Sequence, residues 1–184
     1  MFSIRYDLRV PPGLSLKHGE QYRVALEMAK WGDDRGFTTV SLSEHHDTDD
    51  GFMHSPLTLA AGILGATRNI ACHICALALP LHDPIRIAEE IATIELFAPG
   101  RLAVVAGLGY RPSEFAMFGK DLTKRVKDLE DAVEFMLAAW KGGEVIYRGR
   151  PVRVSPAPAT TPNLLIGGSV PAAAKRAALL RLPY

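Results

Sequence analysis

Three consecutive residues suited to proton transfer, Glu44, His45 and His46, follow a short run of strand-forming residues. A histidine titrates near neutral pH, so it can act as a general base or hydrogen-bond a bound ring. If the strand continues, the two histidines point to opposite sides and one can face a site. The alternative is a polar loop in which a histidine packs on a neighbour. We predict no metal site, because no H-E-x-x-H motif and no second ligand cluster occurs.

A second candidate is the turn Gly167-Gly168-Ser169, which lies between a predicted strand and a helix that starts near Pro171. Backbone N–H groups at a helix N-terminus bind phosphate, and glycine allows a ligand to approach the backbone closely. The alternative is a tight turn in which Ser169 caps the helix. Gly107-Leu108-Gly109 is either a second point of close approach or only a turn.

Alternating strand-like and helix-like segments must position these residues. Strands are predicted over residues 2–8, 38–43, 70–79, 102–106 and 163–166. Helices are predicted over about residues 20–35, from Pro56, from Pro84 to about Phe97, over about 123–140 and from Pro171. Alternation around Gly149 predicts a small hairpin over residues 144–154. Trp31 and Trp140 lie on helix stripes and are predicted core residues.

This alternation predicts an α/β fold with parallel strands joined by right-handed crossovers. A dinucleotide-binding sheet should carry G-x-G-x-x-G after its first strand, but the similar run 107–112 follows the fourth and ends in proline. In a (β/α) barrel, sites lie on the rim made by the C-terminal ends of the strands. Polar and glycine-rich residues follow that rule at Tyr6-Asp7, Glu44–His46, His82-Asp83, Gly107–Tyr110 and Gly167–Ser169.

Composition excludes several classes of function. The 184 residues are 48% hydrophobic and 22% charged, with a formal charge of +1, so nothing favours binding to nucleic acid or an anionic membrane. Arg5, Asp7 and Arg9 interrupt the N-terminal segment, so we predict no signal peptide and a cytoplasmic location. Cys72 and Cys75 point to opposite faces of a predicted strand, which argues against a metal or redox pair.

Four segments taken together resemble the bacterial luciferase-like oxidoreductases, which use reduced FMN or coenzyme F420. In the family's order, these segments are Phe37–His46, Pro80–Glu89, Gly100–Gly119 and Asn163–Ala178. The resemblance implies a barrel with flavin at the rim and His45 as the catalytic histidine. It also implies a non-proline cis peptide at Cys75–Ala76 behind the isoalloxazine ring, and a phosphate-binding turn at Gly167–Ser169.

On this basis we predict a flavin- or F420-dependent oxidoreductase, specifically a monooxygenase acting on a small organic substrate with O2. The predicted catalytic residues are Glu44 and His45. The predicted cofactor contacts are Tyr6, Cys75, Ala76, Gly107, Leu108, Gly109, Gly167, Gly168 and Ser169. One departure is Leu108, which stands where some members place an arginine near the phosphate; Arg111 follows three residues later.

The length of the chain conflicts with a closed barrel. Five βα units account for all 184 residues, whereas eight close the ring. We therefore expect one domain over residues 1–184 that is truncated relative to a full barrel. It is either the N-terminal portion of a longer enzyme or a reduced barrel whose open edges are covered in a homodimer or another oligomer. Two alternatives follow: a shortened protein that binds flavin without turnover, and an interaction subunit completed by a partner chain.

Overall fold

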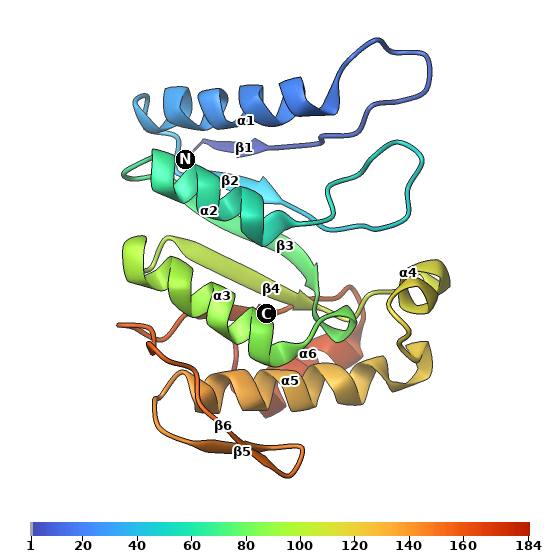
Figure 1. Cartoon of the computed structure of the whole chain (residues 1–184), viewed down its shortest axis with the longest axis vertical. Coiled ribbons are helices and arrows are strands. Elements are labelled where there is room, and N and C mark those ends of the chain that lie inside the picture. Colours follow the sequence, from blue (N-terminus) through green and yellow to red (C-terminus); the bar gives the residue numbers. More distant parts are fainter. Residues whose placement is uncertain (1) are drawn as a thin grey trace.

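A parallel sheet forms the centre of the molecule in the computed structural model, which describes residues 2–184 (Figure 1). Its strands are β1 (Ser3–Arg5), β2 (Thr39–Leu42), β3 (Ala71–Ala78), β4 (Leu102–Gly107) and β7 (Asn163–Ile166). Each strand pairs in parallel with the next one along the chain, in the order β1-β2-β3-β4-β7. Sequential parallel pairing is the arrangement of a (β/α) barrel, and the predicted α/β class is confirmed.

Helices follow these strands along the chain, and the first three lie one after another in chain order (Figure 1). They are α1 (His18–Asp33), α2 (Pro56–Ala66), α3 (Pro84–Phe97), α4 (Pro112–Met117), α5 (Arg125–Ala139) and α6 (Pro171–Leu180), with 3-10 turns at Leu79–Leu81 and Leu122–Lys124. The start of α3 is defined by Asp83, whose side chain accepts hydrogen bonds from the N–H groups of Ile85 and Arg86. The predicted hairpin is confirmed as antiparallel β5 (Val145–Tyr147) and β6 (Arg150–Val152).

The two faces of the sheet differ in burial. One row of side chains lies under the helices and is almost fully buried: Val40, Leu42, Cys72, Ile74, Leu102, Val104, Leu164 and Ile166. The alternate row is only partly covered and includes Arg5, Ser41, His73, Cys75, Val105 and Leu165. The sheet therefore presents a more open face, which corresponds to the interior of a barrel.

The first strand is shorter than predicted, since β1 covers only Ser3–Arg5. Two further differences concern helices. Trp31 is 51% exposed, so its assignment to the core was wrong. Helix α1 instead buries the small residues Ala25, Ala29 and Gly32, and a Cβ on Gly32 would lie 3.0 Å from the Cδ1 atom of Ile4. This close approach turns the larger side chains outward. Trp140 is buried as predicted, and its Nε1 donates to the carbonyl of Ala88 at 3.0 Å.

The second difference is the short helix α4, which the sequence pattern left as a loop. It follows β4 and carries Glu114 and Phe115, both buried, toward the C-terminal ends of the strands. None of the helices described within residues 2–184 combines the length and apolar character that a membrane span requires.

Candidate active site

A cavity of about 450 Å³ lies where the parallel strands end. Every strand of the parallel sheet has residues in it or directly after it that line this cavity. The lining residues are Arg5, Ser43, Glu44, His45, Phe52, Cys75, Ala76, Ala78, Gly107, Leu108, Gly109, Tyr110, Glu114, Gly167, Gly168, Val170 and Ala173. The position agrees with the rim of a barrel, where loops of different units meet.

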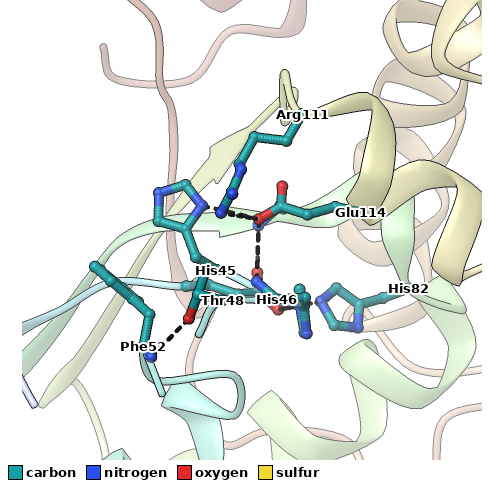
Figure 2. A network of polar contacts seen from close by, with 9 residues as sticks. His45, His46, Thr48, Phe52, His82, Arg111 and Glu114 are labelled. Atoms are coloured by element: carbon teal, nitrogen blue, oxygen red, sulfur yellow. Dashed lines mark hydrogen bonds and ion pairs between the residues drawn. The ribbon is translucent and has the colours of Figure 1, made fainter. Parts of the chain in front are cut away.

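His45 borders the cavity and is held by Glu114 of α4. The Nδ1 atom of His45 lies 2.9 Å from Oε1 of Glu114, and the same oxygen accepts the backbone N–H of His46 at 3.0 Å (Figure 2). Because a carboxylate only accepts, Nδ1 carries the proton and Nε2 holds the lone pair of the neutral imidazole. The rings of Phe52 and Tyr110 pack edgewise on the imidazole, at centroid distances of 4.8 and 5.7 Å.

His45 and Glu114 differ in how far their side chains are exposed. The side chain of His45 is 26% exposed, whereas that of Glu114 is 2% exposed. Arg111 lies beside the pair, with its Nη1 at 3.8 Å from the same Glu114 oxygen (Figure 2). The His45 imidazole therefore faces the cavity, while the buried Glu114 fixes its orientation through Nδ1.

Glu44 is the centre of a second, more deeply buried network. Its Oε1 accepts from Nε2 of His46 at 3.0 Å and from Nε2 of His82 at 2.6 Å, and its Oε2 accepts the N–H of Ala78 at 2.5 Å. Burial by itself would raise the pKa of Glu44, but hydrogen bonds from both histidines, the charge of His82 and the Ala78 N–H together lower it to about 2. Glu44 is therefore a carboxylate at neutral pH.

The donor atoms of Glu44, His46 and His82 lie within 4.8 Å of one another, a spacing that a divalent ion could bridge. In the structure the same atoms satisfy each other by hydrogen bonds. The cluster is thus accounted for as a polar network, and the absence of a metal site stays a prediction.

One wall of the cavity consists of small residues around a cis peptide. The bond between Cys75 and Ala76 is a non-proline cis peptide, which confirms what the resemblance implied. Gly107 lies against this wall, because a Cβ there would approach the Cβ of Ala76 to 2.9 Å. With Ala78 also in the lining, the wall has no bulky side chain to prevent a planar ring from lying along it.

The turn after β7 closes the other end of the cavity. Gly168 has a φ of +151°, and a Cβ there would lie 2.6 Å from the Cβ of Ala173. The Gly167 N–H is bonded to the carbonyl of Ala106 at 2.9 Å. Within residues 2–184, no intramolecular hydrogen bond uses the N–H groups of Gly168, Ser169 or Val170, which directly precede α6.

The structure brings together most of the predicted site residues, but not Tyr6 and Ser169, which do not line the cavity. The Tyr6 hydroxyl donates to the carbonyl of Ala25 at 2.6 Å, and burial, with a smaller contribution from Cys72, raises its pKa to about 12. Tyr6 therefore joins β1 to α1. Ser169 is exposed at the turn.

Sequence reasoning missed Glu114, Phe52 and Arg5 as cavity residues. Glu114 lies inside one of the resembling segments, yet its helix spans only six residues and its buried contact is with a residue 69 positions away. Nothing in local periodicity reveals such a contact.

Comparison with known proteins identifies the family. The model of the luciferase-like monooxygenase family matches residues 6–184. The chain belongs to the luciferase-like monooxygenases. Among similar proteins is the alkanal monooxygenase alpha chain of Photorhabdus luminescens, 31% identical over 112 residues, which are 61% of this chain and 30% of that protein.

Solved structures show the same fold. Monooxygenase RslO1 from Streptomyces bottropensis superimposes with a TM-score of 0.86 and 25% identity, over 97% of this chain and 57% of that one. The oxygenating constituent of 3,6-diketocamphane monooxygenase from Pseudomonas putida, solved with FMN, has a TM-score of 0.72 at 20% identity, over 91% of this chain and 51% of that one. This luciferase-like chain spans between 30% and 38% of the length of the curated relatives it matches.

Proposed function

We propose that this luciferase-like protein is an oxidoreductase that uses reduced FMN or coenzyme F420, and that it oxygenates a small organic substrate with O2. The observation that carries the proposal is one cavity that joins an oriented histidine, a flat wall of small residues and a glycine turn with unpaired N–H groups. Membership in the luciferase-like monooxygenases supports the same reaction class.

The residues present fit a planar cofactor that carries a phosphate. The ring would lie along Cys75–Ala76 and Gly107, where side chains are small. The phosphate would accept from the N–H groups of Gly168, Ser169 and Val170, at the positive end of the α6 dipole. These contacts replace the arginine that Leu108 does not supply. When bound, the reduced cofactor supplies the electrons that activate O2, while the protein positions it and excludes water.

His45 would move a proton at its Nε2 atom. Glu114 holds the imidazole through Nδ1 and stabilises the imidazolium that forms when Nε2 takes up a proton. Phe52 and Tyr110 pack edgewise on the imidazole and limit its movement. Glu44 contributes differently, because it ties the loop after β2 to Ala78 at the end of β3.

Titration of the purified protein with FMN, riboflavin and F420 tests the proposal. We expect saturable quenching of FMN or F420 fluorescence, with FMN bound more tightly than riboflavin because only FMN carries the phosphate. Gly168→Ala should weaken FMN binding about tenfold, since its Cβ would clash with Ala173 and distort the turn, and should affect riboflavin less. Absence of any change in absorbance or fluorescence with all three compounds would contradict the proposal.

Oxygen uptake distinguishes an enzyme from a binding protein. Reduced flavin is supplied with a panel of aldehydes and ketones, and substrate-dependent product formation is measured. Stoichiometric binding without turnover would support the non-catalytic alternative.

The open sheet edges favour a second candidate function, that of a subunit completed by another chain. Within residues 2–184, β1 and β7 each pair with a single strand, and unpaired edges are normally covered. Light scattering tests this: a homodimer or larger assembly is expected, and a stable monodisperse monomer would contradict it.

A further inference from the structure

Arg5 occupies a distinctive position at the end of β1. It lies in the open row of the sheet, in register with Ser41 of β2, which is itself in register with His73 of β3. Its side chain lines the cavity together with Ser43 and Cys75. None of these four neighbours carries a carboxylate. Asp7, two residues further along, feels the charge of Arg5, but its pKa is lowered chiefly by the hydrogen bond from Arg9, which holds its carboxylate.

Arg5 also lacks a counter-charge. Among residues 2–184 no carboxylate lies within 4.0 Å of its guanidinium, and no intramolecular hydrogen bond uses it. Arg9 shows the contrast within the same segment, since its Nε donates to Asp7 at 2.8 Å and its Nη1 lies 3.7 Å from Asp50. An arginine that faces a cavity without a partner is available to an anion from outside the chain.

The two carboxylates that line the cavity are already engaged. Glu114 holds His45 and the backbone of His46, while Glu44 accepts from two histidines and Ala78. Neither is drawn toward Arg5. The charge of Arg5 also acts inside the cavity, on Cys75: burial raises the pKa of the Cys75 thiol, and the charge of Arg5 opposes that rise. The positive charge of Arg5 is therefore felt at the Cys75–Ala76 cis peptide, on the cavity wall.

The location of Arg5 separates it from the phosphate turn. β1 and β7 are at opposite ends of the sheet, so Arg5 lies at the end of the cavity away from Gly168. We propose that Arg5 binds an anionic oxygen group, specifically a carboxylate, of the organic substrate, which selects small organic acids over neutral compounds. This inference rests on the proposed function, which assigns the rest of the cavity to the flavin or F420 cofactor. A planar guanidinium binds a carboxylate through two parallel hydrogen bonds, which fixes orientation as well as charge.

A matched pair of probes tests this, namely benzoate and its neutral isostere benzamide. Calorimetric titrations are run on the protein alone and on the protein loaded with FMN. We expect benzoate to bind at least about tenfold more tightly than benzamide, since charge-assisted hydrogen bonds are roughly twice as strong as neutral ones. Arg5→Gln should abolish the preference and Arg5→Lys should retain part of it. Arg150→Gln, at an exposed position in the hairpin, should leave it unchanged.

The outcomes separate the possible sources of the anion. If Arg5→Gln removes the preference and leaves binding of reduced FMN unchanged, the substrate assignment is supported. If Arg5→Gln weakens reduced FMN while benzoate shows no preference, Arg5 serves the electron-rich edge of the cofactor and the inference is overturned. Equal binding of the two probes by the wild-type protein, or a preference that survives Arg5→Gln, also overturns it. A benzoate preference in a protein that binds no flavin would support the Arg5 site while contradicting the proposed function.

Discussion

Two buried glutamates hold the same tripeptide in different ways. Glu114 contacts one partly exposed imidazole and a backbone N–H, from a helix that follows β4. Glu44 belongs to the tripeptide itself and accepts from two imidazoles and a backbone N–H, with a side chain that is fully buried. Both are carboxylate–histidine networks, but only the first includes an imidazole with a nitrogen available to the cavity.

This difference shows how neighbouring histidines acquire different functions. The Glu44 network engages both oxygens of a buried carboxylate and contributes rigidity, since each lost partner would leave a buried group unpaired. The Glu114 network holds Nδ1 of His45 and leaves its Nε2 atom free, so that this nitrogen can transfer a proton. The histidines are adjacent in sequence, so chain position alone does not separate these roles.

Removing Glu44 should have the largest effect. Glu44→Ala leaves His46, His82 and the Ala78 N–H without their acceptor, so we expect a loss of about 3 kcal/mol or more in the free energy of unfolding. Urea denaturation at pH 7 measures it. Glu90→Ala, which removes only an exposed partner of Arg86, is the control and should change stability by about 0.5 kcal/mol or less. Equal effects of the two substitutions would refute the structural role of Glu44.

Substitution of the two adjacent histidines should separate activity from stability. His45→Ala is expected to reduce turnover about 100-fold, because it removes the group assigned to proton transfer, while leaving FMN affinity nearly unchanged. His46→Ala should mainly lower the urea midpoint, since His46 is buried against Glu44. Product formation with an active aldehyde or ketone and denaturation curves on both variants provide the measurements. A reversed pattern would exchange the two assignments.

Glu114→Gln should give a smaller effect on turnover. The amide oxygen can still accept from His45 and from the His46 backbone, but the charge that stabilises an imidazolium is lost. We expect turnover to fall about tenfold with little change in stability. Steady-state kinetics and thermal unfolding of the same preparation test this, with Glu114→Asp as the variant that keeps the charge. Unchanged turnover in Glu114→Gln would show that the negative charge of Glu114 does not contribute to the reaction.

The smallest expected effect is on acid stability. The pKa of Glu44 is lowered from 4.5 to about 2 in the folded protein, so its stabilisation is present above pH 4.5 and is lost as the pH falls toward 2. Between pH 6 and pH 4 this predicts a loss of about 1 kcal/mol from this group. The urea midpoint measured at several pH values should fall more steeply in the wild type than in Glu44→Gln. Parallel curves would contradict the assignment.

Much of the fold followed from local patterns. Alternating strands and helices, proline at the first turn of several helices and Asp83 as a cap all appear in the structure. The stripe on α1 was misjudged because periodicity identifies an apolar face but not how closely the helix can approach the sheet. Only small residues fit where α1 packs this closely against the sheet, so Trp31 lies on the exposed side of the helix.

The sequence by itself determined the kind of protein: a βα chain with a Glu-His-His segment and a glycine turn at strand ends, in an order shared with the luciferase-like monooxygenases. The resemblance already pointed to His45, but only the tertiary structure shows which side chains hold the two histidines, because Glu114 and His82 are distant from them in sequence. It also decided that Tyr6 belongs to the β1–α1 contact and that Arg5 faces the cavity unpaired. Hydrogen-bond partners and burial depend on contacts across the sheet, and those contacts exist only once the strands have paired.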